Sequence, residues 1–342
     1  MPTTATGAQT PVLDASTAQP LTGAVSGMDV GGGFGCLVKG DGTVWCWRTA
    51  ANGNTYGSLG NGTTDTNGAT FRATQVLTAA NKPLTNAKSM GQASSCAVTN
   101  DGKLYCWGDV TWAINNGTSL VSPYAQAITT DGSTPLSGVQ QASYGGGEMC
   151  ALITGSTNNE VWCWGYNGNS NLGTGDTTNR RYPTKILGLT NPSAVAVAQN
   201  YYAFTGACAV DGGSVLCWGY NRYGQIGIGN LNTPVTVPTL VKLQGGVTPL
   251  TGVLELYVGT EATICALHSG NTLWCWGSGY QSYADSTGIT NVVAAGSAQP
   301  PTYAQYLTSD GLYHLGAVTI SPKCGSLQYP SQSARLPCRL LP

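Results

Sequence analysis

Apolar residues in this chain occur in short runs, and none of the runs has the length and period of an amphipathic helix. The runs are rich in valine, leucine, threonine, tyrosine and tryptophan, and clusters of glycine and asparagine separate them. Short β-branched and aromatic runs bounded by turn residues are typical of β-strands. The pattern therefore predicts an all-β protein with almost no helix.

The same phrases return along the chain at a nearly constant interval. Six cysteine pairs can be drawn, and their leading cysteines are 60, 54, 58, 57 and 59 residues apart. In five pairs the second cysteine is followed by tryptophan, as in "VWCWG" at 161–165. The pairs are Cys36/Cys46, Cys96/Cys106, Cys150/Cys163, Cys208/Cys217, Cys265/Cys275 and Cys324/Cys338. Regular self-similarity of this kind indicates a repeat architecture.

Two further phrases frame each cysteine pair. A leading phrase such as "PLTGVL" precedes it, and an extended segment such as "VPTLVKL" follows it. We assign leading phrases to 20–25, 83–88, 135–140, 191–197, 249–254 and, in degenerate form, 312–318. We assign closing segments to 73–79, 124–130, 182–188, 237–243, 303–309 and, at the start of the chain, 11–15.

Repeats of this size built from small antiparallel sheets predict the blades of a β-propeller. Six leading phrases, six cysteine pairs and six closing segments predict about six blades, with seven as the alternative. We expect one domain over 11–342 and a flexible arm over 1–10. The N-terminal strand would complete the last blade, which removes an exposed sheet edge.

The cysteine spacing predicts one disulfide in each repeat. In most pairs a turn residue, such as Asp41, Asp101 or Gly270, lies midway between the two cysteines. A hairpin folded about that midpoint brings the cysteines opposite each other on adjacent strands, within disulfide reach. Strict pairing without a leftover cysteine favours disulfides in an oxidising compartment, whereas free buried thiols are the alternative.

With these motifs, the chain resembles the regulator-of-chromosome-condensation repeat family of β-propellers. The segments "CALHSGNTLWCWG" (265–277) and "CWGYNRYGQIGIG" (217–229) carry the closest likeness, whereas the tails at 108–118 and 277–286 have lost their glycines. The family's best-known members have seven blades, and the eponymous nuclear exchange factor acts on a small GTPase and chromatin. The extracellular bacterial branch is the nearer analogue, and it implies protein binding through loops on one face of the ring.

Charge and hydropathy narrow the expected partners. The 342 residues include only 8% charged side chains, where about 25% is usual, and the formal net charge is −1. Neither nucleic acid nor an anionic membrane is therefore expected as a partner, and close assembly with copies of itself meets little repulsion. No apolar run is long enough for a membrane span, and 1–10 lacks signal-peptide features. The chain is then either cytoplasmic or a processed form.

Candidate chemistry is sparse. His268 and His314 are isolated, the aspartates precede turn glycines, and Cys-x-x-Cys is absent, so we expect no catalytic, metal-binding or cofactor-binding residues. Trp47, Trp107, Trp164, Trp218 and Trp276 recur once per repeat and are expected to pack between blades. Asn61 and Asn116 open glycosylation sequons. The candidate binding surface consists of Trp112, Tyr124, Tyr166, Tyr220, Arg222, Tyr223 and Tyr280.

The favoured hypothesis is a non-enzymatic extracellular or cell-surface protein that binds other proteins or self-assembles as a surface subunit, filament subunit or adhesin. A secreted inhibitor-like binder belongs to the same class, and a glycan is an alternative ligand. The competing hypotheses are a glycan-active enzyme at the propeller channel and an intracellular exchange factor or scaffold.

Overall fold

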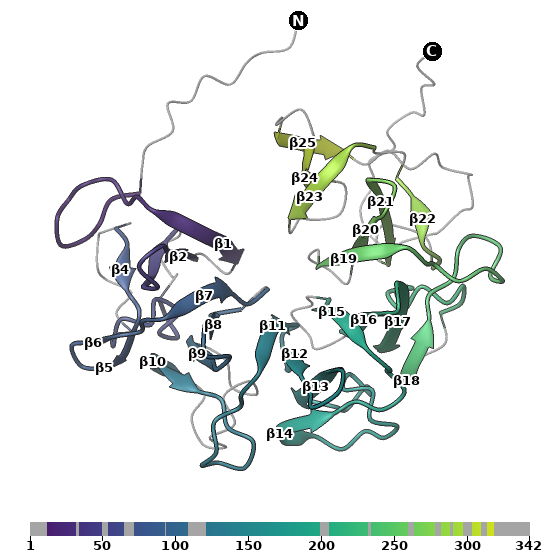
Figure 1. The fold of residues 1–342 in the computed structure, drawn as a ribbon, viewed down its shortest axis with the longest axis horizontal. Coiled ribbons are helices and arrows are strands. Elements are labelled where there is room, and N and C mark those ends of the chain that lie inside the picture. Colours follow the sequence, from purple (N-terminus) through teal and green to yellow (C-terminus); the bar gives the residue numbers. More distant parts are fainter. Residues whose placement is uncertain are drawn as a thin grey trace, which may run out of the picture.

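Six small antiparallel sheets stand around a common centre like the blades of a propeller (Figure 1). The computed structural model describes residues 12–31, 34–49, 54–64, 72–92, 94–108, 121–198, 205–231, 234–258, 263–277, 282–287, 290–296, 303–308 and 313–317. Every regular element within these ranges is a β-strand, and none is a helix. The all-β propeller that the sequence predicts is therefore confirmed.

Within the described residues, five blades have four strands each and the sixth has three. Blade 1 contains β1 (Ala24–Gly31), β2 (Phe34–Lys39), β3 (Val44–Arg48) and β4 (Thr74–Gln75). Blade 2 contains β7 (Ala87–Met90), β8 (Cys96–Thr99), β9 (Leu104–Gly108) and β10 (Ser122–Ala127). Blade 3 contains β11 (Val139–Tyr144), β12 (Glu148–Thr154), β13 (Asn159–Gly165) and β14 (Arg180–Lys185).

The remaining blades follow in chain order around the ring. Blade 4 contains β15 (Pro192–Val197), β16 (Gly206–Asp211), β17 (Ser214–Gly219) and β18 (Val235–Leu240). Blade 5 contains β19 (Val253–Val258), β20 (Thr263–His268), β21 (Thr272–Gly277) and β22 (Asp285–Ser286). Blade 6 contains β23 (Val292–Gly296), β24 (Tyr303–Thr308) and β25 (Tyr313–Ala317), and a small hairpin of β5 (Leu77–Ala79) and β6 (Lys82–Pro83) joins blades 1 and 2.

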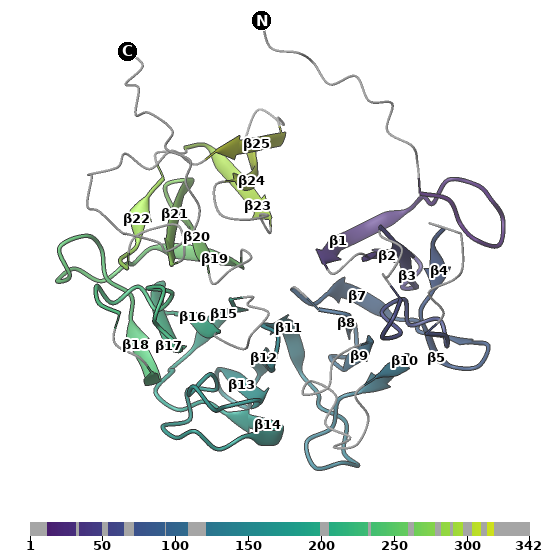
Figure 2. The same ribbon diagram turned by 180° about the vertical axis from the view of Figure 1, so that it is seen from behind.

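In blades 1 to 5 the first strand lies nearest the centre and the fourth lies at the rim (Figures 1 and 2). The second and third strands form a tight hairpin in which two cysteines are opposite each other, as Cys208 and Cys217 are. Disulfides join these pairs, with Cα atoms 4.0–4.1 Å apart. The bonded pairs are Cys36–Cys46, Cys96–Cys106, Cys150–Cys163, Cys208–Cys217 and Cys265–Cys275.

Blade 6 differs from the sequence prediction. The segment 303–309, expected to close blade 5, forms β24, and it pairs antiparallel with β25 in the segment expected to lead blade 6. In this hairpin Gln305 lies opposite Leu315, the register that cysteines occupy in the other blades. The outer strand of blade 5 is β22, and blade 6 begins at Val292. The assignment of 303–309 and 312–318 was therefore wrong, and Cys324 and Cys338 lie outside the described residues.

The N-terminal segment has the geometry of a blade-to-blade connection. Leu13 bridges Pro20 as Lys242 bridges Pro249, and Asp14 pairs in parallel with Ala73 as Leu243 does with Ala284. Residues 12–21 thus occupy the place that follows an outer strand in other repeats. The residues that would form that outer strand, and the arm at 1–10, lie outside the described residues, so closure of the ring by the N-terminus stays a prediction.

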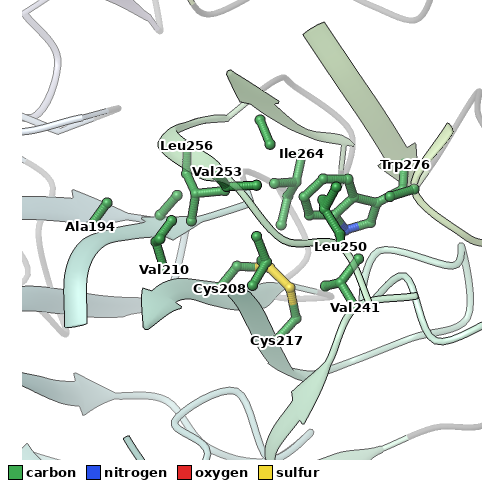
Figure 3. Packing of buried hydrophobic residues seen from close by; sticks show 14 of the residues in the cluster. Ala194, Cys208, Val210, Cys217, Val241, Leu250, Val253, Leu256, Ile264 and Trp276 are labelled. Carbon is green, nitrogen blue, oxygen red and sulfur yellow. A yellow bond between two sulfur atoms is a disulfide. The ribbon is translucent and has the colours of Figure 1, made fainter. Parts of the chain in front are cut away.

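The core lies between neighbouring blades as well as within them. Figure 3 shows this for blades 4 and 5, where Val210 and the Cys208–Cys217 disulfide face Leu256, Ile264 and Trp276 of the next blade. These side chains are almost fully removed from solvent. Full burial of an aliphatic or aromatic side chain contributes about 1.5–3 kcal/mol. The blades are therefore held together by shared apolar contacts.

Candidate interaction surface

Loops of one design connect the third and fourth strands at the same end of blades 1, 3 and 4. We call them the tail loops, and they comprise 54–62, 167–175 and 221–229. Each begins with a buried asparagine, Asn54, Asn167 or Asn221, whose side-chain oxygen accepts the backbone N–H five residues later at 2.9–3.1 Å. Satisfying that buried N–H by a side chain fixes the course of the loop. The recurring asparagine is therefore structural.

The tail-loop glycines make room for the tryptophan of the next blade. Gly173 has φ +68°, and a Cβ on it would lie 2.6 Å from Cδ1 of Trp218. Gly60 meets Trp107 and Gly227 meets Trp276 in the same way. We call the packed interface between two neighbouring blades a seam. In two of these seams the indole N–H also donates to a tail-loop carbonyl oxygen, from Trp107 to Ser58 and from Trp276 to Gln225, each at 3.0 Å. The Cys-Trp-Gly tryptophans thus lock one blade to the preceding tail loop.

Replacing Gly173 with alanine should destabilise the protein by about 2–3 kcal/mol, because the new methyl group collides with Trp218 and a positive φ disfavours alanine. Gly188 is the matched control, since its φ is +85° and nothing lies within 4 Å of the place that a Cβ would occupy. Gly188→Ala should cost only about 1 kcal/mol for the backbone. Equal losses for the two variants in denaturant unfolding would contradict the tryptophan contact.

Two tyrosines stand exposed at equivalent positions of separate tail loops. Tyr56 in blade 1 is 51% exposed, and Tyr223 in blade 4 is 39% exposed. Each lies two residues after the buried asparagine and directly before a glycine. Arg222 beside Tyr223 is also exposed. The surface at this end of the ring therefore exposes two tyrosine rings and the Arg222 guanidinium group. The loops that carry them are held in place by their buried asparagines.

The other residues of the candidate surface are placed differently. Tyr220 is buried, with its ring centroid 6.2 Å from that of Tyr223, so it supports Tyr223 from beneath. Tyr166 and Tyr124 are half-buried, and Tyr124 packs against Gly62. Trp112 and Tyr280 lie outside the described residues. Tyr56 was missed, although the shared phrase "Asn-x-Tyr-Gly" links it to Tyr223.

At the centre of the ring, polar side chains of one blade are hydrogen-bonded to backbone groups of another. Gln92, which follows β7 of blade 2, donates its Nε2–H to the carbonyl oxygen of Leu256 in β19 of blade 5 at 3.3 Å. The side-chain oxygens of Gln141 and Ser143 accept the N–H groups of Val195 and Val197 at 3.0 and 2.9 Å. These contacts tie the inner strands together. The inner strands of blades 2, 3 and 4 carry no carboxylate, whereas β1 of blade 1 contains Asp29 and β19 of blade 5 contains Glu255.

Asp41 and Asp101 lie in hairpin turns, and His268 is the last residue of β20. Asp41 and Asp101 accept hydrogen bonds from the hydroxyls of Thr43 and Thr99, which hold the pKa of each carboxyl below its usual value. His268 accepts the N–H of Gly270 at 3.1 Å. Within the described ranges, no group of three or more His, Cys, Asp or Glu side chains is placed to hold a metal ion. Nor does that part of the chain contain a helix long and apolar enough to cross a bilayer.

Glu148 is a buried acid with a strongly raised pKa that the sequence does not single out. It begins β12 and is 0% exposed. Burial raises the pKa of its carboxyl to about 8, although the nearby Thr205 hydroxyl and Asn171 amide oppose the rise. The acid is therefore mostly neutral at physiological pH. The sequence shows that an acid stands at this place in the repeat. It does not show that the acid is buried, because the burial depends on packing against the neighbouring blade.

Comparison with known proteins agrees with this architecture. Two models of the "Regulator of chromosome condensation (RCC1) repeat" match, one at residues 158–203 and 212–265 and the other at 89–109. The E3 ubiquitin-protein ligase HERC2 of Mus musculus is 28% identical over 196 residues, which are 55% of this chain and 4% of that protein. The ultraviolet-B receptor UVR8 of Arabidopsis thaliana is 26% identical over 244 residues, which are 69% of this chain and 50% of that protein.

Solved structures show the same fold. Prp20p from Saccharomyces cerevisiae has a TM-score of 0.60 at 16% identity, over 84% of this chain and 70% of that one. Human WBSCR16 has a TM-score of 0.59 at 16% identity, over 78% of this chain and 67% of that one. The chain spans only half or less of the two curated relatives described above. This protein therefore carries regulator-of-chromosome-condensation (RCC1) repeats at the matched positions, and its blades have the topology of the solved RCC1-type β-propellers.

Proposed function

We propose that this protein is a non-enzymatic propeller that works outside the reducing cytosol and binds proteins through its tail-loop face. The observation that carries the proposal is the set of five disulfides, one in each of blades 1 to 5. Nine of the ten bonded cysteines are 0% exposed. Disulfides used in this repeated, structural way are characteristic of extracellular proteins, since cytosolic reductants keep thiols reduced.

The tail-loop face supports binding because its exposed groups are held rigidly. Tyr56 and Tyr223 project from loops whose first residue and glycines are buried in the seams. Tyrosine and arginine dominate the energy of protein interfaces, and side chains that are already ordered lose little entropy on binding. Because only 8% of the residues are charged, we expect the protein to recognise a partner mainly through aromatic and polar contacts.

The partner proposed is a protein, either a second copy of this chain or a different one. Prp20, which shares the fold, is recorded in a complex with Kap60 and in binding to Gsp1p and histones, so protein binding occurs on this architecture. The near-zero net charge favours contact between copies. For self-assembly as a surface or filament subunit, the arm at 1–10 would reach the neighbouring copy.

The compartment is tested by counting free thiols in protein purified from its native source under alkylating conditions. We expect the ten cysteines of blades 1 to 5 to resist alkylation until a reductant is added, and the matching disulfide-linked peptides to appear. Twelve alkylated cysteines without reductant would overturn the extracellular assignment.

The binding face is tested by sedimentation velocity over a range of concentrations, with the double variant Arg222→Ala, Tyr223→Ala. This variant should weaken self-association at least tenfold, whereas Leu187→Ala should leave it unchanged, since Leu187 is 76% exposed on a blade connection at the other end of the sheets. Removal of 1–10 should also weaken assembly while unfolding stays the same. A wild-type monomer at all concentrations would exclude self-assembly and direct the search to another protein, using cross-linking in native material.

A further inference from the structure

The seam between blades 3 and 4 contains a buried acid without a counter-charge. Glu148 is 0% exposed, and among the described residues its carboxyl oxygens make no hydrogen bond of ordinary length and angle, although the Thr205 hydroxyl and the Asn171 amide lie close enough to lower its pKa. A buried polar group normally finds a partner, because burying one without a hydrogen bond is destabilising. An acid kept in such a place at this cost suggests a role that packing alone does not supply.

A carboxamide and a hydroxyl lie beside this acid, one from each blade. Asn171 belongs to the tail loop of blade 3, and Thr205 precedes β16 of blade 4. Both are 0% exposed, and both act on the Glu148 carboxyl. The Asn171 Nδ2–H group donates to Thr205 Oγ1 at 2.5 Å and to the Thr205 carbonyl oxygen at 3.2 Å. Its Oδ1 accepts the backbone N–H of Asn169 at 3.1 Å.

This combination is not repeated at the equivalent positions of blades 1 and 4. In blade 4, Gly206 stands in the place of Glu148 and Gln225 in the place of Asn171, and the two are in contact. In blade 1 the same places hold Phe34 and Ser58. Neither pair joins an acid to an amide. The acid, amide and hydroxyl therefore distinguish the seam between blades 3 and 4 from these other tail-loop sites.

We propose that Thr205 and Asn171 form an intramolecular ester that links blades 3 and 4 covalently, with Glu148 transferring the protons. Thr205 Oγ1 attacks Cγ of Asn171, so an O–C bond forms, the C–Nδ2 bond breaks and ammonia leaves. One carboxyl oxygen of Glu148 takes the hydroxyl proton while the other gives its proton to the departing nitrogen. Glu148 ends in its original protonation state, and no oxidant, reductant or cofactor is consumed.

The contacts of Asn171 with Thr205 and with Asn169 suit the attack. Cγ is one bond from the nitrogen that already contacts Oγ1, so a small rotation of the amide brings oxygen and carbon into the range of about 3–3.5 Å for attack. The Asn169 N–H points at Oδ1, where negative charge develops. Burial raises the pKa of Glu148 to about 8, so the neutral acid that the exchange requires is present at neutral pH. Burial also shields the ester from water.

Tryptic mapping tests the proposal, because the two residues fall in different peptides. Asn171 lies in 104–180 and Thr205 in 186–222, and Arg180, Arg181 and Lys185 separate these peptides. The full chain is folded with its disulfides formed, held at neutral pH for several days, then reduced, alkylated and digested. We expect a species that joins 104–180 to 186–222, lighter than their sum by one ammonia, which hydroxylamine separates.

Three variants identify the groups involved. Glu148→Gln keeps the shape but cannot exchange protons, so the linked species should fall at least tenfold. Thr205→Val should abolish it, and Thr205→Ser should restore it. Separate peptides only, in wild-type protein with intact disulfides, would overturn the ester. Equal linkage in wild type and Glu148→Gln would overturn the role of Glu148. Because the mapping reports only this bond, its result is independent of the proposed binding function.

Discussion

Replacing Trp276 with alanine should lower the free energy of unfolding by about 3–5 kcal/mol, the range expected for truncating a fully buried aromatic side chain. Trp276 is 0% exposed and fills the seam between blades 4 and 5, where it contacts Gly227 and donates to the Gln225 carbonyl oxygen at 3.0 Å. Its loss leaves a cavity and a carbonyl without its donor. Urea or guanidinium unfolding, followed by tryptophan fluorescence and circular dichroism, measures the change.

Trp274 is the matched control, two residues earlier on the same strand. It is half-buried, and its indole N–H donates to Thr272 within its own blade at 3.1 Å. Trp274→Ala removes the same side chain without opening the seam, so we expect a loss of only about 1–2 kcal/mol. If both variants lost the same stability, the tryptophan of the Cys-Trp-Gly motif would not be what joins the blades.

Local pattern predicted most of the architecture because each blade is folded by short-range signals. Turn residues midway between cysteines specify the second and third strands, and the structure places Cys208 opposite Cys217 as that interpretation requires. The leading phrases run into the innermost strands of blades 1 to 5, as 249–254 does into β19 (Val253–Val258). These features depend on residues of a single hairpin, which are close together in the sequence and can therefore be recognised from it.

The prediction failed for blade 6, where the strongest signal is missing. Its hairpin has Gln305 and Leu315 in the cysteine register, so an alignment anchored on cysteines passed over it and counted from Cys324 instead. The turn "Ser-Asp-Gly" at 309–311 was present as a hairpin signal, but the spacing of cysteines outweighed it.

Features that depend on two blades were beyond sequence reasoning. The glycines of the tail loops were interpreted as turn residues, yet Gly173 is needed because Trp218 of the following blade approaches it. Glu148 was one scattered acid in the sequence, and only the packing of blade 4 over it excludes solvent. Contacts across a seam join residues that are far apart in the sequence, so the repeat pattern does not predict them.

Stability should fall as the pH rises from about 5 to 9, and Glu148→Gln should remove most of that fall. Burial raises the pKa of Glu148 in the folded protein to about 8, from an ordinary value of 4.5. Between these two values the folded state binds a proton that the unfolded state has released. Its stabilising effect is complete below about pH 4.5 and is lost as the pH passes through about 8. At roughly 1.4 kcal/mol per pKa unit, the loss is on the order of 3–5 kcal/mol.

Glutamine keeps the shape of the neutral acid at every pH, so the variant and the wild type should have similar stability near pH 5 and diverge progressively as the pH rises to about 8, with the variant more stable. Glu160→Gln is the matched control, because Glu160 is only partly buried and bonds to Lys185 at 2.7 Å. That salt bridge lowers the pKa of Glu160, so its titration lies below the tested range and the slope from pH 5 to 9 should stay as in wild type. Thermal unfolding across this range decides the matter. A wild-type slope that persists in Glu148→Gln would show that the acid is not neutral in the folded seam, and proton transfer by a neutral Glu148 would fail with it.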